Sequence, residues 1–163
     1  MHGNSDSGRP SETDITDKML YELACIFFGS VGFSKNPSAL NCLIDLRSRY
    51  QEAEANVLLI SIAATIRRRS ETITEYEKNL VIDLGLDNVG KYYRVESDEN
   101  NVIPLKFREA CNKIIHANKT EFSYHPNTGV LSPNVKLYGS QKGRNWSAYI
   151  EISTFIQSAW HHG

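Results

Sequence analysis

Residues 134–152, NVKLYGSQKGRNWSAYIEI, carry an apolar residue at every second position on both sides of a glycine-containing turn. The apolar positions are Val135, Leu137, Trp146, Ala148, Ile150 and Ile152. A period of two residues is typical of strands that bury one face, and Gly143 and Asn145 suit the connection between them. The stretch therefore predicts a β-hairpin at about 130–153, which breaks with the helical period of the preceding sequence.

The first helical segment precedes this hairpin by about a hundred residues. Between 16 and 28, apolar residues recur at intervals of three and four, which predicts an amphipathic helix. Thr13 or Thr16 can cap its N-terminus, and the two glycines of FFGSVG (27–32) are expected to end it. Residues 1–13 are polar and rich in Ser, Gly, Asp and Asn, and we expect them to form a disordered tail.

A second helical region begins at the pair Asn36–Pro37 and contains no further proline or glycine before residue 70. It is either one long helix or two helices broken near Tyr50. The part ANVLLISIAATI (55–66) is apolar on most sides, which is typical of a helix at the centre of a bundle.

Three shorter helices complete the expected elements: 74–85, the region from Pro104 to Asn118, and 154–160 after a Ser153 cap. The predicted fold class is mainly α. It is a bundle of about four to five helices with a small C-terminal β-hairpin and a short terminal helix. The whole of 14–163 is expected to form a single domain.

Composition limits the possible partners. The chain has 163 residues and a formal net charge of −1, so any contact with RNA requires a local basic patch rather than bulk attraction. Its three cysteines form no CxxC pair and lack the spacing of metal ligands, which indicates free thiols in a reducing compartment and no metal or cofactor. No apolar run is long enough to span a bilayer, so we expect a cytoplasmic protein without a membrane partner.

The helix around FREACNKIIHANK (107–119) carries Arg108, Asn112 and His116 at four-residue intervals. These three lie opposite the apolar face, with Glu109 and Lys113 expected further into solvent. An imidazole can transfer a proton, a guanidinium can bind a phosphate, and an amide can orient either group. Together they suit metal-independent cleavage of RNA. Alternatively, the row is the wet side of an amphipathic helix, with Arg108 paired to an acid of ESDEN (96–100).

The segment REACNKIIHA (108–117) resembles the motif helix of the HEPN superfamily, whose motif is an arginine followed, after four to six residues, by a histidine. Asn112 matches the polar position and His116 the histidine, but the arginine position holds Cys111, and Arg108 lies one turn earlier. The resemblance implies a helical, dimeric protein of a bacterial toxin–antitoxin or phage-defence system, often a ribonuclease. Either Arg108 replaces the missing arginine or nuclease activity has been lost.

Weaker candidates for RNA contact are Lys113, Lys142 and Arg144, the last two at the predicted hairpin tip. A solvated turn with Trp146 in the core is the simpler interpretation. The arginines of RRRS (67–70) are likewise interpreted as a helix end. Two functions therefore stay open: an RNA-binding protein or ribonuclease, and a non-catalytic interaction module such as an antitoxin, immunity or scaffold protein with a cognate protein partner.

Overall fold

A computed structural model describes residues 11–34, 41–69, 87–94 and 102–162. Two helices come first along these residues, and the strands follow in two groups separated by a short helix, with one more helix at the end. The helices are α1 (Glu12–Ser34), α2 (Asn41–Arg69), α4 (Phe107–Ile115) and α5 (Ile152–His162). The strands are β1 (Asn88–Tyr93), β2 (Val102–Lys106), β3 (Lys119–Tyr124), β4 (Leu131–Gln141) and β5 (Arg144–Glu151).

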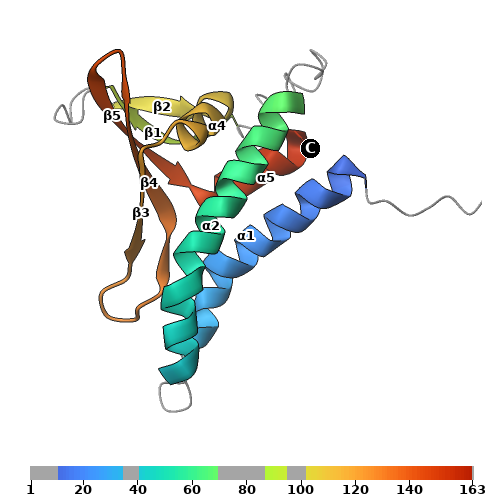
Figure 1. Ribbon diagram of the computed structural model, residues 1–163, viewed down its shortest axis with the longest axis vertical. Helices are drawn as coiled ribbons and strands as arrows, with labels where there is room; N and C mark the ends of the chain where they lie inside the picture. The colour runs from blue at the N-terminus through green and yellow to red at the C-terminus, as the bar shows by residue number, and fades with distance from the viewer. Residues whose placement is uncertain (1–10, 35–40, 70–86, 95–101, 163) are drawn as a thin grey trace, which may run out of the picture.

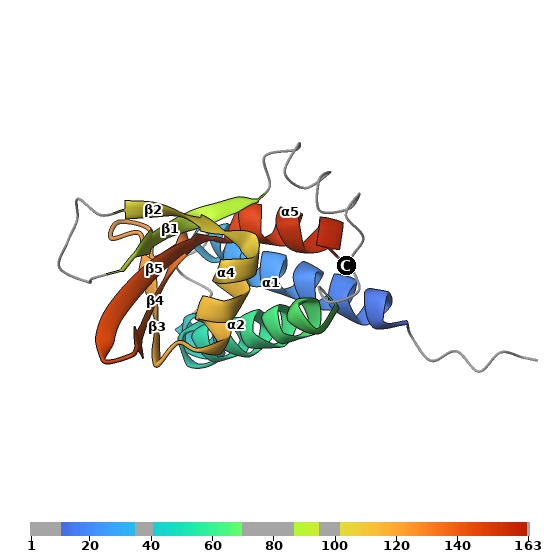
Figure 2. The same ribbon diagram turned by 90° about the horizontal axis from the view of Figure 1, so that it is seen from above.

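The strands form one antiparallel sheet in the order β2-β1-β5-β4-β3. The helices lie on one side of this sheet, with α4 between the sheet and α2 (Figures 1 and 2). The expectation of a mainly helical bundle with a small hairpin is therefore wrong for the described residues. The protein has a two-layer α/β arrangement with a substantial sheet.

The hairpin was predicted correctly, but it is the centre of the sheet and not an appendage. Val135 pairs with Ile150 and Leu137 with Ala148, as the alternation indicates. A lone hairpin would leave hydrogen-bonding groups unpaired along both edges, and here β1 pairs with β5 while β3 pairs with β4.

The two long helices differ from expectation at their ends. Ser11 caps α1, because its Oγ accepts a hydrogen bond from the Asp14 N–H at 3.1 Å while the Ser11 N–H donates to the Asp14 carboxylate at 2.8 Å. Thr16 is buried in the first turns. The helix passes through Gly29 to Ser34, and α2 is unbroken at Tyr50. The predicted Asn36–Pro37 start and the helix at 74–85 lie outside the described residues.

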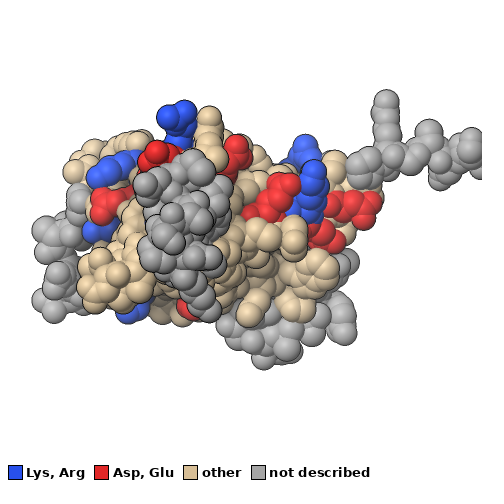
Figure 3. Space-filling view, turned by 90° about the horizontal axis from the view of Figure 1, so that it is seen from below, with Lys and Arg blue, Asp and Glu red and all other residues tan. Residues whose placement is uncertain are grey.

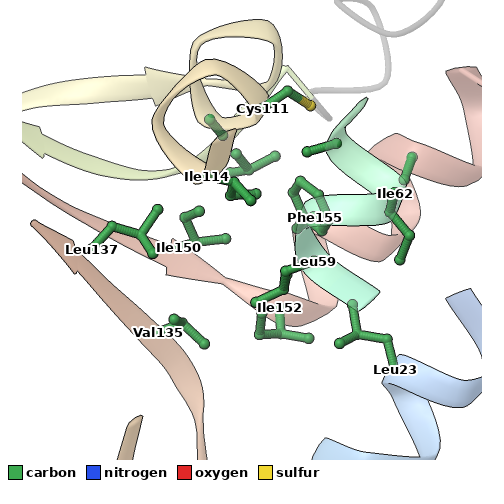
Figure 4. Packing of buried hydrophobic residues seen from close by; sticks show 14 of the residues in the cluster. Leu23, Leu59, Ile62, Cys111, Ile114, Val135, Leu137, Ile150, Ile152 and Phe155 are labelled. Carbon is green, nitrogen blue, oxygen red and sulfur yellow. The ribbon is translucent and has the colours of Figure 1, made fainter. Parts of the chain in front are cut away.

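Large apolar side chains from both layers meet in one core (Figure 4). Leu23, Leu59 and Ile62 enter from the helices, and Phe155 packs on Phe107 with ring centroids 5.5 Å apart. These contacts fix α4 against α2, α5 and the sheet. The position of α4 sets the geometry of the site described next.

Hydrogen bonds fasten α2 to the far edge of the sheet. The Arg47 guanidinium donates to the carbonyl of Gly129 at 2.8 Å. The hydroxyl of Thr120 donates to Asn56 at 2.9 Å, and that of Tyr124 donates to Glu52 at 2.9 Å.

Candidate functional site

A pocket of about 630 Å³ lies where α4, the C-terminal end of α2 and the β4–β5 turn meet; we name it the α4 pocket. Its lining is mostly polar and contains three cationic side chains. The lining residues are Arg67, Glu109, Asn112, Lys113, His116, Asn118, Ser140, Gln141, Lys142 and Trp146.

The side of α4 that faces this pocket is rotated from the one predicted. Asn112 and His116 line it as expected, but their companions are Glu109 and Lys113. Arg108 is exposed and is not among the lining residues. The apolar face was placed correctly, with Phe107, Ala110, Cys111 and Ile114 buried. The rotation arises because the sheet curls around α4 and covers the flank that a free helix would present to water.

Lys113 shows this covering most clearly, since it is only 5% exposed where the sequence placed it in solvent. Its ammonium lies 4.4 Å from the ring centroid of Tyr92 and 4.5 Å from that of Trp146. It forms an ion pair with Glu109 at 3.2 Å and a 3.3 Å hydrogen bond to the Tyr92 hydroxyl. Two aromatic faces, a carboxylate and a hydroxyl therefore replace the water that a buried ammonium loses.

Gly139 makes this cage possible. A Cβ atom at position 139 would lie 2.2 Å from Cζ2 of Trp146, closer than atoms can approach. Trp146 pairs with Gly139 across the hairpin and is 3% exposed, as its phase with Ala148 predicted. The glycine therefore supplies the space in which the indole lies flat beside Lys113.

Asn112 and His116 form the polar end of α4. The side-chain Oδ1 of Asn112 is buried and has no hydrogen-bond partner among the described residues. A buried carbonyl left in this state costs about 1–3 kcal/mol, and because less than 1 Å² of Oδ1 is accessible, a donor in the pocket reaches it only when the Asn112 side chain turns. His116 is exposed, ends the helix with φ −104°, and donates its backbone N–H to the carbonyl of Asn112. Its imidazole is open to solvent and to the pocket.

The remaining cations come from elements far apart in the sequence. Arg67 lies at the end of α2, where the sequence suggested only a solvated helix end. Lys142 and Gly143 form the β4–β5 turn with φ values of 52° and 76°. Both values are left-handed, as in a type I′ turn, where asparagine or glycine is usual. Arg144 is exposed and does not line the pocket.

Tyr92 and Arg67 are the functional residues that sequence analysis missed. The segment that carries Tyr92 was interpreted as a loop or short strand. Tyr92 lies 21 residues before Lys113 in the sequence, and only the tertiary fold brings the two side chains together. For Arg67, the only available signal was the run of three arginines. The buried Cys111 beneath the pocket has its pKa raised to about 12 by burial, so its thiol is neutral and unsuited to nucleophilic chemistry.

Within the described residues, no three His, Cys, Asp or Glu side chains are grouped as metal ligands would be. None of the helices there is sufficiently long and apolar to cross a bilayer. On the face seen in Figure 3, basic and acidic side chains are interspersed over a surface that is mostly neither. Because the formal net charge is −1, attraction for an anion at the α4 pocket depends on the charges of the side chains that line it.

Comparison with known proteins adds no identity. No family model, no curated protein and no solved structure matches this chain.

Proposed function

We propose that the protein binds single-stranded RNA, with one phosphodiester and its ribose held in the α4 pocket. Three cations line this pocket against one carboxylate, and Lys113 is already paired with that carboxylate. Lys142 and Arg67 also line the pocket, and both carry side chains of the kind that contact phosphates.

The buried Oδ1 of Asn112 carries the proposal and favours RNA over DNA. An acceptor without a partner needs a donor, and the ribose 2′-hydroxyl is a donor that deoxyribose lacks. The backbone of Lys142 adds support. A lysine in the left-handed region costs about 1 kcal/mol relative to glycine, and here its side chain brings a cation to the lining of the pocket.

Metal-independent cleavage is a second activity that this arrangement favours, because His116 lies beside Asn112 at the pocket. In such a step the 2′-hydroxyl turns from Asn112 Oδ1 to the imidazole, which takes its proton, and the 2′-oxygen bonds to phosphorus. The bond from phosphorus to the 5′-oxygen then breaks, and water protonates that oxygen. The products are a 2′,3′-cyclic phosphate and a 5′-hydroxyl. Arg67 would stabilise the phosphate charge in place of the Arg108 that the sequence suggested.

The biological setting is proposed from sequence features alone. The resemblance of 108–117 supports a bacterial toxin–antitoxin or phage-defence system. The free thiols of Cys25 and Cys111 support a reducing cytoplasm.

Binding is tested by fluorescence anisotropy with one labelled oligonucleotide sequence made as RNA and as DNA. Lys142→Asn should weaken RNA binding about fivefold while leaving the hairpin at least as stable, since asparagine tolerates this turn. Arg144→Gln, from the same turn but outside the pocket, is the matched control and should change binding less than twofold. Equal affinity for RNA and DNA would rule out the 2′-hydroxyl contact.

Cleavage is tested separately, in EDTA, by following the same RNA on a denaturing gel. We expect His116→Ala to bind RNA as the wild type does and to lose the cyclic-phosphate product. If wild type and variant cleave equally, or if neither cleaves, the catalytic step is wrong while the binding proposal stands. If no RNA binds, the non-catalytic interaction module becomes the better account.

A further inference from the structure

The outer side of α2 exposes large apolar side chains to solvent. Leu46 is 48% exposed, Tyr50 51%, Val57 59% and Ile60 42%. Ala53 and Ala64 lie between and beyond them and are also exposed. We name the set Leu46, Tyr50, Ala53, Val57, Ile60 and Ala64 the α2 seam. Scattered exposed apolar residues need no explanation, but a continuous row of them marks a contact surface.

The six positions follow one another at intervals of four and three residues. At the α-helical rotation they fall within an arc of about 80° and extend over about 27 Å. The buried face of α2, which includes Ala55 and Ile62, lies on the opposite side. The helix is therefore apolar on two opposite sides, of which the described part of the chain covers only one. A 4-3 spacing is the pattern by which one helix packs along another.

The rest of the described chain leaves this side of α2 uncovered. In Figure 2, α2 runs along the rim of the helical layer, with α5 on the far side of the core. Glu52 and Asn56 of α2 bond to β3, and Arg47 bonds to Gly129 in the β3–β4 connection. Gln51 and Arg69 bond to Ile26 and Thr13 of α1. None of these bonds involves a seam residue.

We infer that the α2 seam binds the same seam of a second copy of this chain, with the two helices parallel and in register. In heptad terms Tyr50, Val57 and Ala64 occupy a positions, and the other three seam residues occupy d positions. The choice of a second copy rests on charge. Arg49 and Glu54, both exposed, then fall at the flanking g and e positions, five residues apart.

In a parallel pair, each g residue meets the e residue five positions further along the other helix. Arg49 of each copy would therefore meet Glu54 of the other, which gives two symmetric ion pairs. An antiparallel pair centred on the same seam would instead bring the two Glu54 carboxylates together. The charges at Arg49 and Glu54 are thus complementary between two copies of this helix when the helices are parallel. This inference does not rest on the proposed RNA-binding function.

The surface is tested by sedimentation velocity of the full chain at about 1–100 µM, the range expected for a short seam. We expect a reversible dimer that Ile60→Glu weakens at least tenfold. The control is Val102→Glu on β2, because Val102 is also 42% exposed but lies in the sheet. It should leave the dimer unchanged. A monomer at 100 µM, or a dimer equally sensitive or insensitive to both substitutions, would overturn the inference.

The orientation is tested by exchanging the charges. Arg49→Glu and Glu54→Arg should each weaken the dimer about threefold to tenfold, and the double variant should restore it to within twofold. Circular dichroism checks that each variant folds. Independently, Ala53→Cys, in a chain with Cys25 and Cys42 replaced by serine, should oxidise to a disulfide dimer, because d residues of parallel helices face each other. No restoration by the double variant, together with no cross-link, would overturn the parallel arrangement.

Discussion

Helices α4 and α2 break the rule of apolar inside and polar outside in opposite directions. On α4, Lys113 is only 5% exposed, whereas on α2 Val57 is 59% exposed. The lysine is surrounded by partners from its own chain: the Glu109 carboxylate, the Tyr92 hydroxyl and two aromatic faces. Val57, by contrast, lies in a row of exposed apolar residues on the same helix.

The difference separates two kinds of surface. Where the fold buries a charge and satisfies it, the neighbouring groups form a shaped pocket with one acceptor, Asn112 Oδ1, still without a partner. Where the fold leaves a periodic apolar row, the missing contacts have to come from another molecule. The pocket therefore suits a small polar group such as a phosphate and ribose, and the seam suits a helix.

Truncation of Lys113 and Val57 should invert the usual ranking of charged and apolar residues, because here the lysine is buried and the valine is exposed. We expect Lys113→Ala to lower the free energy of unfolding by about 3 kcal/mol, because it removes a buried aliphatic stem and its cation–π contacts. Val57→Ala should cost less than about 0.5 kcal/mol at concentrations where the chain is monomeric. Urea denaturation of both variants measures this. Equal costs would mean that Lys113 is not caged or that Val57 is not exposed.

Two glycines sharpen the same contrast. Gly139→Ala should destabilise the protein by about 2 kcal/mol, because the new methyl group collides with Trp146 and opens the Lys113 cage. Gly29→Ala, in α1 with nothing within 4 Å, should stabilise it by about 0.5–1 kcal/mol through helix propensity. Thermal unfolding followed by circular dichroism gives both values. If the two variants had the same melting temperature, the close packing at Gly139 would be wrong.

Alkaline pH should lower the stability of the protein through Cys111, which lies on the buried face of α4. Burial raises the pKa of Cys111 from 9.0 to about 12, so above pH 9 the unfolded chain loses a proton that the folded chain keeps. The contribution of Cys111 to stability is complete below pH 9 and is lost as the pH rises toward 12. Urea midpoints between pH 8.5 and 10.5 should fall less steeply for Cys111→Ala than for the wild type. Parallel slopes would contradict burial of this thiol.

Thiol labelling contrasts an exposed cysteine on α1 with the buried cysteine on α4, and it changes the protein least. In a Cys42→Ser chain at pH 8, a thiol reagent should modify the exposed Cys25 of α1 quickly. Cys111 on α4 should react only after unfolding, since it is both buried and protonated. Mass spectrometry of peptides identifies the modified residue. Rapid native modification at Cys111 would contradict the packing of α4 against the core.

The sequence predicted those elements whose periodicity is local. The hairpin at 134–152 alternates strongly, and the apolar face of α4 repeats every three or four residues, so both were placed correctly. Strands NVGKYY (88–93) and KTEFSY (119–124) carry weaker alternation, and their pairing partners are distant, so the sheet was underestimated. A bundle was then inferred to cover α2 on all sides, which is why its exposed seam was interpreted as core.

The candidate site was predicted in part, for the same reason. Asn112 and His116 follow from their spacing on one helix, and both line the α4 pocket. The burial of Lys113 depends on Tyr92 and Trp146, which reach it only through strand pairing, and Arg67 arrives from another helix. The periodicity of one segment gives no information about contacts with other segments. Arg108 was therefore preferred over residues that only the tertiary fold brings together.

The most direct measurement of the central claim is an NMR titration of the ¹⁵N-labelled chain with a short RNA and the matching DNA. The account predicts that RNA shifts the side-chain amide of Asn112 and the backbone signals of His116 and of 140–142, with smaller changes from DNA. Shifts confined to other surfaces, or the same shifts from both nucleic acids, would contradict the assignment of the α4 pocket to RNA.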